Sequence, residues 1–302
     1  MLVDRLRAAR ADLDVQVVII TTEGDRSQGL PPAAFAERGI FVRELESALE
    51  SGVIDAAVHS LKDVPAVLPD AFTLAAIPER GDARDVLHCC DQAHRWTTLP
   101  PGARIGTSSQ RRAAQLRHHR PDLAFVPMRG NVETRLAKVD RGAYDACVLA
   151  AVGLQRLGLH AAITEYLPVD LCLPEAGQGA LAVEIRAGDD RTSSLVRLLD
   201  DPACRLAVEA ERSAVAAIGG GCLTPTACYG VLDGDEFWLR GVVASPDGVR
   251  LLATSVRRPI PQAGETAIAL ASELLALGAE ELLAHDGEPA VSGSGDGISR
   301  PG

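Results

Sequence analysis

The spacing of hydrophobic residues predicts alternating helices and strands in the first half of the chain. Residues 2–11 place Leu2, Leu6 and Ala9 on one helical face. The apolar run VQVVII at 15–20 is typical of a strand that is buried on both faces of a parallel sheet. Further helices are predicted at 41–52 (ending at Gly52), 110–119 and 131–140, and further strands at 56–59, 103–106, 123–128 and 145–152. This alternation predicts an α/β fold with parallel sheets.

The hydrophobic pattern changes after residue 200, which predicts a separate C-terminal domain. Residues 203–218 form an Ala-rich helical pattern, and three consecutive glycines would end that helix. Asp-Gly pairs at 233–234 and 247–248 separate three apolar stretches, as in an antiparallel meander, and a helix is predicted near 263–277. The polar tail at 286–302 is expected to be disordered.

Two Pro- and Gly-containing stretches, 77–82 and 173–180, interrupt the strand–helix alternation. They predict that the chain leaves one α/β lobe, builds a second lobe and then returns to the first. The predicted division is a discontinuous lobe 1 (1–78 and 180–198), a lobe 2 (83–174) and a small α+β domain (202–285).

Charge and composition narrow the classes of function. The 302 residues carry a net charge of -11, so no global basic field would draw the protein to nucleic acid or to anionic lipid. No apolar run approaches the roughly 20 residues of a membrane-spanning helix, and the charged N-terminus does not resemble a signal peptide. We therefore expect a cytoplasmic protein with no membrane or nucleic-acid partner.

Seven cysteines are present, and most are expected to be small buried residues in a reducing compartment. Cys222 differs because it follows three glycines, in the loop IGGGCLTPTA, where a thiol would be accessible. The run of His88, Cys89 and Cys90 with His94 has poor spacing for zinc, and we expect no metal site.

Polar side chains follow the strand at 56–59 in the motif HSLKDVP. Ser60, Lys62 and Asp63 come directly after the strand, and ligands of open α/β sheets bind at the carboxyl ends of strands. A charged surface turn would have the same spacing, so this motif alone does not distinguish a site from a turn.

Four arginines accompany two other predicted helix starts. GTSSQRR places Arg111 and Arg112 in the first helical turn, where the helix dipole disfavours cations, so a bound anion is favoured. One of the two could instead be solvated. RGNVETR adds Arg129 and Arg135. With Lys62, these five cations would suit a substrate with several carboxylates, because guanidinium groups bind carboxylates bidentately.

Four motifs in this order carry a resemblance to a known family: HSLKDVP, GTSSQRRAAQL, RGNVETRLAK and GGGCLTPTA. GIFVRELE, GLQRLGL, GQGA and CRLAVEAER reinforce it. From about residue 15 to about residue 285 the chain resembles the porphobilinogen deaminase (hydroxymethylbilane synthase) family. Each motif alone is weak, whereas the ordered set is highly specific.

The resemblance implies a transferase that joins four porphobilinogen units head to tail, releases ammonia from each and frees hydroxymethylbilane by hydrolysis. It implies a covalent dipyrromethane primer linked by a thioether to Cys222, and it implies that Asp63 is the catalytic carboxylate. Cys228 is a poorer attachment candidate because it lies in the first predicted strand of the meander.

The resemblance also implies residues that bind the carboxylates of cofactor and substrate. These are Ser60, Lys62, Ser109, Arg111, Arg112, Arg129, Arg135 and Arg156, with Gln178 and Phe41 as weaker candidates. It further implies a monomer with two lobes similar to type II periplasmic binding protein domains, and a third, α+β domain that carries Cys222.

The family usually opens with a strand and an Arg- and Ser-bearing loop, and this chain begins within the helix that should follow them. We therefore expect lobe 1 to lack its first strand, which would leave residues 15–20 without a neighbour. Either the start codon is assigned too late, which we favour, or the chain is a shortened and impaired homologue.

Two other interpretations stay open at this point. A two-lobed solute-binding module would need the cleft but not Cys222, and would usually carry a secretory signal. A degenerate, non-catalytic homologue would fit the altered N-terminus, but Asp63, Cys222 and the five cations are all present.

Overall fold

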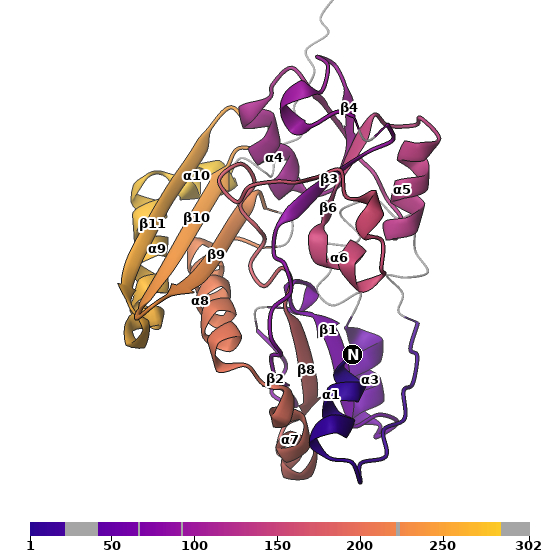
Figure 1. Cartoon of the computed structure of the whole chain (residues 1–302). Coiled ribbons are helices and arrows are strands. Elements are labelled where there is room, and N and C mark those ends of the chain that lie inside the picture. The colour runs from indigo at the N-terminus through magenta and orange to yellow at the C-terminus, as the bar shows by residue number, and fades with distance from the viewer. Residues whose placement is uncertain (22–41, 66, 92, 222–223, 285–302) are drawn as a thin grey trace, which may run out of the picture.

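The computed structural model describes residues 1–21, 42–65, 67–91, 93–221 and 224–284 (Figure 1). Three separate sheets organise these residues into a mixed α/β fold. We call the elements around the first sheet lobe 1, those around the second lobe 2 and those around the third the C-terminal domain. Among the described helices, none is both long and apolar enough to cross a membrane.

Lobe 1 contains a three-stranded antiparallel sheet in the order β1-β8-β2. Its strands are β1 (Ala56–Ser60), β2 (Phe72–Ala76) and β8 (Leu181–Arg186), and its helices are α1 (Leu2–Ala9), α3 (Arg43–Glu50) and α7 (Asp190–Val196). Helix α1 packs Leu2 and Leu6 against a core that includes Ile185 and Leu199, so the predicted N-terminal helix is confirmed; of its predicted apolar face, Leu2 and Leu6 contact the core, whereas Ala9 is exposed.

The predicted strand at residues 15–20 is wrong. This segment is irregular and pairs with no described strand, and Val17 and Ile19 are 69% and 90% exposed. A strand needs neighbouring backbone groups for its hydrogen bonds, and β-branched residues favour strands only where they pack against a neighbour. The segment has no such neighbour among the described residues, where the lobe 1 sheet consists of β1, β8 and β2.

Lobe 2 contains a five-stranded mixed sheet in the order β5-β4-β6-β3-β7. Its strands are β3 (Asp85–Cys89), β4 (Arg104–Gly106), β5 (Ala124–Val126), β6 (Ala146–Ala150) and β7 (Glu165–Tyr166). Its helices are α4 (Gln110–His119), α5 (Val132–Asp140) and α6 (Ala151–Arg156). Successive residues of β3 enter different apolar clusters, Val86 on one face and Leu87 on the other, so the sheet is buried on both sides.

The expectation of parallel sheets holds only for the pairs that β4 makes with β5 and β6. Strand β3 is antiparallel to β6, and every described pair in lobe 1 is antiparallel. The reason is the double crossing between lobes, because a strand that enters from the other lobe need not follow the direction set by local strand–helix units. The predicted helices at 110–119 and 131–140 and the predicted strands at 56–59, 103–106, 123–128 and 145–152 are confirmed within a few residues.

The C-terminal domain places two helices on one face of an antiparallel meander. Helix α8 (Pro202–Ile218) ends at Gly219, whose φ of 80° is the left-handed conformation that glycine adopts readily. Strands β9 (Thr226–Asp233), β10 (Glu236–Ala244) and β11 (Leu251–Pro259) are followed by α9 (Ala263–Ala276) and α10 (Ala279–Ala284). Fully buried Phe237 lies at the centre of this core, and the predicted meander and helices are confirmed.

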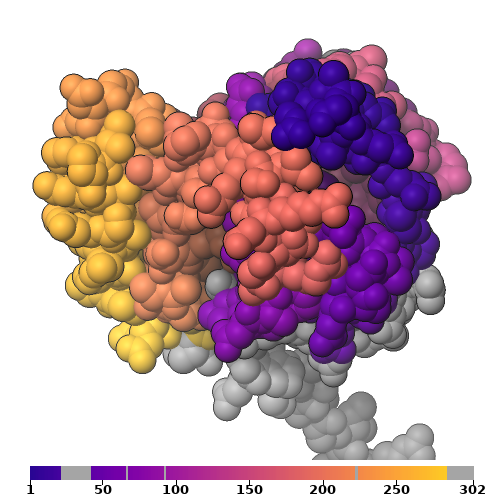
Figure 2. Space-filling model, turned by 90° about the horizontal axis from the view of Figure 1, so that it is seen from below, coloured from indigo at the N-terminus to yellow at the C-terminus, as the bar shows by residue number. Residues whose placement is uncertain are grey.

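The segments that join the two lobes run side by side. The Gly81 amide donates to the Gly179 carbonyl oxygen at 3.1 Å, and a Cβ at Gly179 would lie 2.7 Å from the Gly81 oxygen. A side chain at Gly179 would therefore push the two segments apart. Figure 2, seen from below, shows the C-terminal residues (orange to yellow) adjoining the N-terminal residues (indigo and purple) through the segment around residues 190–220.

Candidate functional site

The second crossing segment, residues 173–180, brings together cations from three different elements. Lys62 Nζ lies 3.5 Å from Gln178 Oε1, and Arg112 Nη2 donates to the same oxygen at 3.3 Å. Arg156, at the end of α6, donates from Nη2 to the backbone carbonyl oxygen of Gly179 at 2.8 Å. The side chain of Gln178 is fully buried, so this amide links the Lys62 turn of lobe 1 to α4 of lobe 2.

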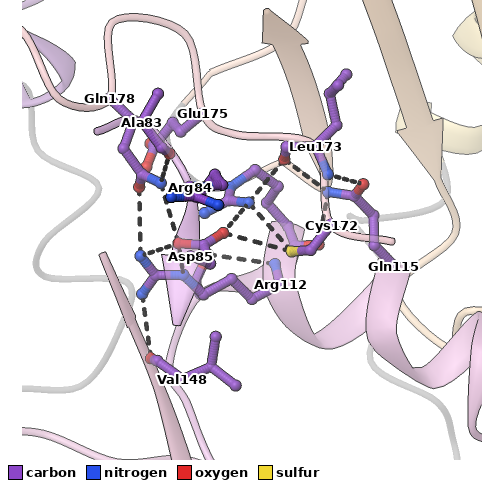
Figure 3. A network of polar contacts seen from close by, with 12 residues as sticks. Ala83, Arg84, Asp85, Arg112, Gln115, Val148, Cys172, Leu173, Glu175 and Gln178 are labelled. Carbon is purple, nitrogen blue, oxygen red and sulfur yellow. Dashed lines mark hydrogen bonds and ion pairs between the residues drawn. The ribbon is translucent and has the colours of Figure 1, made fainter. Parts of the chain in front are cut away.

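Asp85, at the start of β3, is the centre of a buried charged network (Figure 3). One carboxylate oxygen accepts from Arg111 Nη1 at 2.8 Å, and the other accepts from Arg112 Nε at 2.9 Å. Gln178 Nε2 donates to that second oxygen at 3.0 Å. Burial alone would raise the pKa of Asp85, but the two guanidinium groups more than offset this effect and hold the pKa well below its usual range.

The beginning of α4 explains why both arginines point inward. Ser109 is the N-cap residue, and its hydroxyl accepts from the Arg112 amide at 3.4 Å. Arg111 and Arg112 were expected to contact an anion. The anion that they contact in the structure is the Asp85 carboxylate of the protein itself. The alternative of a solvated arginine is wrong, because Arg111 is 3% and Arg112 6% exposed.

The cations outnumber the carboxylates in this network. Arg111 Nε and Nη2 are buried and have no hydrogen-bond partner in the described structure. Arg135 on α5 donates only to the Gly130 carbonyl oxygen among its described contacts, and its pKa is lowered first by burial and then by the charge of Arg112. Burial likewise lowers the pKa of Arg156. These features favour an additional anion at this place.

Asp63 lies at the end of a short 3-10 turn, Leu61–Asp63, that follows β1. Solvent reaches its side chain, yet the surrounding protein still desolvates the carboxylate and raises its pKa. Among the neighbouring charges, Lys62 lowers the pKa, Glu175 raises it and His59 lowers it. Asp63 is thus a partly desolvated carboxylate under the electrostatic influence of Lys62.

The remaining predicted site residues are not among the Asp85 contacts given above, or they lie outside the described residues. Ser60 is exposed at the end of β1, opposite Leu181 in the register of β8. Arg129 is half-buried, and its carbonyl oxygen accepts from Lys138 Nζ at 2.8 Å. Phe41 and Cys222 lie outside the described residues, as does the tail at 286–302.

Five of the six described cysteines are buried: Cys89, Cys147, Cys172, Cys204 and Cys228. Burial raises the pKa of Cys89 and Cys204 to about 11 and that of Cys147 and Cys172 to about 12, and it raises the pKa of Cys228 as well. The expectation that most cysteines are buried is confirmed. The burial of Cys228 also agrees with its rejection as an attachment point.

Comparison with known proteins decides the family. A profile described as "Porphobilinogen deaminase, dipyromethane cofactor binding domain" matches residues 1–194, and the profile of the C-terminal domain of porphobilinogen deaminase matches 205–276. The chain belongs to the porphobilinogen deaminase family. The porphobilinogen deaminase of Roseiflexus castenholzii is 48% identical over 94% of this chain and 93% of its own length. That of Syntrophotalea carbinolica is 47% identical over 93% of this chain and 89% of its own length.

Solved structures add little to this assignment. The VFT2 domain of Bordetella pertussis BvgS is 17% identical and aligns with a TM-score of 0.39, over 66% of this chain and 75% of its own. A score this low supports no further conclusion.

The family's dipyrromethane cofactor carries several carboxylates, and the described residues fit such a group. The unpaired guanidinium nitrogens of Arg111 are buried donors that lack an acceptor. Arg135 and Arg156 contact only carbonyl oxygens among their described partners. A polycarboxylate would supply the acceptors and the negative charge that these side chains lack.

Sequence reasoning missed Asp85, Arg80 and Glu211. Arg80, in the first crossing, donates to the Gln178 carbonyl oxygen at 2.8 Å and to Glu211 of α8 at 2.6 Å. The available signal was an acid at the head of the apolar strand DVLHC and another acid among the alanines of α8. A charged residue at a core position usually needs a buried partner of opposite charge.

Proposed function

We propose that the chain is a transferase that joins four porphobilinogen molecules head to tail, releases one ammonia for each, and yields hydroxymethylbilane for porphyrin biosynthesis. Its membership of the family and the names of its relatives support this assignment. The observation that carries it in the structure is a set of arginines with capacity for an added anion: Arg111 keeps two buried N–H groups without a partner among the described residues, and Arg135 and Arg156 donate only to carbonyl oxygens there.

The cations would bind and orient the acetate and propionate groups of the substrate. This set comprises Ser60, Lys62, Ser109, Arg111, Arg112, Arg129, Arg135 and Arg156, with Gln178 and Phe41 as weaker candidates. Planar guanidinium groups suit carboxylates because two N–H groups can meet two oxygens. The Asp85 carboxylate would keep Arg111 and Arg112 in place while leaving some of their donors available.

Asp63 would be the catalytic carboxylate. It would stabilise the positive charge that develops on the pyrrole as ammonia leaves, and it would accept and return protons at its carboxylate oxygens. Its partly desolvated position strengthens such an electrostatic interaction relative to bulk water. No carboxylate other than Asp63 was predicted for this role.

Dipyrromethane would be attached through a thioether to Cys222, and when bound it supplies the pyrrole to which the first substrate is joined. A thiol must be accessible to be alkylated, and burial raises the pKa of five described cysteines. The exposed Cys90 follows β3, where its thiol donates to the Asp140 carbonyl oxygen.

We further propose that the domain division follows the predicted boundaries, with lobe 1 at 1–78 and 180–198, lobe 2 at 83–174 and the cofactor-carrying domain at 202–285. The three sheets support this division. The proposal also includes a monomeric, cytoplasmic enzyme without nucleic-acid or membrane partners, and the net charge of -11 supports the absence of those partners.

The experiment is an intact-mass measurement combined with turnover of porphobilinogen. Wild-type protein should carry an added mass of two linked pyrroles and should release ammonia, and Cys222→Ser should lose both. Cys90→Ser, at the exposed described cysteine, is the matched control and should keep both. A folded wild-type protein with unmodified mass that binds porphobilinogen without turnover would instead support a solute-binding module.

A further inference from the structure

Helix α8 of the C-terminal domain contacts the loop that carries Asp63. Arg212 Nη1 donates to the carbonyl oxygens of Leu61 at 3.3 Å and Val64 at 2.9 Å. Arg212 Nη2 donates to the carbonyl oxygen of Pro65 at 2.5 Å. A single half-buried guanidinium therefore binds the backbone on both sides of Asp63.

The same face of α8 supports the loop through apolar contacts. Cys204 and Val208 precede Arg212 at intervals of four residues, so the three side chains share one helical face. Cys204 and Val208 belong to a buried cluster with Leu61, the first residue of the turn, and Val64, the residue that follows it. The apolar contacts hold the loop against the helix, and the hydrogen bonds of Arg212 fix the orientation of its carbonyl groups.

Asp63 itself has no described hydrogen bond from another side chain or from the backbone to its carboxylate. Its location relative to the cations is therefore set by the backbone of the turn rather than by a partner that holds the side chain. All three carbonyl groups that Arg212 binds are separated from Asp63 by at most one residue. A shift of this backbone would move the carboxylate directly.

We propose that Arg212 is a positioning residue for the reaction, because its guanidinium holds the Leu61–Pro65 backbone and so fixes where the Asp63 carboxylate stands. This inference rests on the proposed function of Asp63. Arginine suits the task because its planar group offers five N–H donors in a fixed arrangement. Lysine keeps the charge but offers a single donor atom on a flexible stem, so it should replace Arg212 only in part.

The arrangement also connects Asp63 to the attachment loop. Helix α8 continues from Arg212 to Ile218, about 9 Å at 1.5 Å per residue, and then ends at Gly219. The segment with Cys222 follows directly in the sequence. One helix thus holds the catalytic loop of lobe 1 and leads into the proposed cofactor attachment point.

The test compares Arg212→Gln and Arg212→Lys with Arg205→Gln. Arg205 lies on the same helix and binds lobe 1 through the Leu74 carbonyl oxygen and Asp200, away from the Asp63 loop. Each protein is first shown by intact mass to carry the cofactor, and kcat, KM and thermal unfolding are then measured. A displaced catalytic group can cost about 100-fold in rate, so Arg212→Gln should lower kcat by about that factor with KM within about threefold.

Arg212→Lys should recover about tenfold of that loss in kcat. Arg205→Gln should keep kcat within about twofold of wild type, even where its thermal unfolding temperature falls as much as that of Arg212→Gln. If Arg212→Gln keeps kcat within twofold, or if Arg205→Gln loses activity in parallel with it, the positioning role is wrong. In the second case the helix acts only through overall stability.

Hydrogen exchange gives a readout that does not depend on turnover or on the glutamine variant folding well. The Val64 amide donates to the Leu61 carbonyl oxygen at 3.1 Å, which is one of the oxygens that Arg212 binds. Its exchange should be at least about tenfold faster in Arg212→Lys than in wild type, and unchanged in Arg205→Gln. Unchanged exchange of the Val64 amide in Arg212→Lys overturns the inference. If exchange is faster in Arg212→Lys but the wild-type protein has no activity, only the proposed function is wrong.

Discussion

Replacing Asp85 by asparagine should destabilise lobe 2 strongly. The substitution keeps the shape of the side chain but removes the only carboxylate that pairs with Arg111 and Arg112 among their described contacts. It also turns one acceptor oxygen into an N–H donor that faces guanidinium donors. Both guanidinium groups would then be buried without a counter-charge, since Arg111 and Arg112 are 3% and 6% exposed.

The size of the loss follows from these contacts. Hydrogen bonds to charged groups contribute about 1.5–3 kcal/mol each, so two guanidinium partners correspond to about 3–6 kcal/mol. Breaking a buried ion pair by removing one partner costs about 3–5 kcal/mol. We therefore expect the free energy of unfolding of lobe 2 to fall by about 3–5 kcal/mol at neutral pH.

Urea unfolding followed by the fluorescence of Trp96 measures this loss. Trp96 is buried in a lobe 2 core cluster, and a Trp238→Phe background removes the other tryptophan. The matched control is Asp122→Asn, at an exposed pair with Arg120 in the same lobe, which should leave the curve unchanged. Adding Arg112→Gln to Asp85→Asn should cost less than the sum of the single changes, because it removes one of the unpaired charges.

The pH dependence of the free energy of unfolding provides an independent check that the Asp85 carboxylate stabilises the folded protein. A carboxylate whose folded pKa is depressed stabilises the protein above its unfolded pKa, here 3.8, and loses that contribution as pH falls further. The difference between wild type and Asp85→Asn should therefore shrink below pH 3.8 by about 1.4 kcal/mol per pH unit. A difference below about 1 kcal/mol at neutral pH, or one that does not shrink on acidification, would refute the reasoning.

Two further predictions concern the turn of the C-terminal domain and the acid limb of activity. Gly248→Ala should lower the free energy of unfolding, measured by Trp238 fluorescence in urea, at least twice as much as Gly234→Ala. Both glycines have positive φ, but only a Cβ at Gly248 would lie 2.7 Å from a neighbouring oxygen, that of Ala114; equal losses would contradict this. Because burial raises the pKa of Asp63, the acid limb of kcat/KM should lie above the ordinary aspartate value of roughly 3.9. Glu175→Gln should move the limb to lower pH, since the Glu175 charge also raises that pKa, and a limb that stays in place or moves upward would contradict the assignment.

The sequence predicted local structure best where its signals were local. Helix α4 has the predicted bounds because Ser109 caps it and its residues are good helix formers. Helix α8 ends where the glycines begin, since Gly219 takes up the left-handed conformation. The meander follows from Asp-Gly turns between apolar stretches. Each of these features depends on a few neighbouring residues.

Contacts between distant segments could not be predicted in this way. The run at 15–20 reads as a strand, but strand formation depends on a neighbour that local pattern does not reveal. Arg111 and Arg112 were expected to meet an anion, and only the tertiary structure showed that Asp85, 26 residues away, is one. Arg212 carries no local signal at all, because its three acceptors are backbone oxygens about 150 residues earlier.

The sequence by itself determined the elements of the C-terminal domain and the motifs that contain the candidate site, because periodicity, caps and turns act over a few residues. The tertiary structure decided which charges have a partner of opposite charge among the described residues and which donate only to carbonyl oxygens there. It also decided that α8 holds the Asp63 loop. These outcomes depend on burial, which removes water and makes an unpaired charge costly, and burial is a property of the packed chain rather than of any short segment.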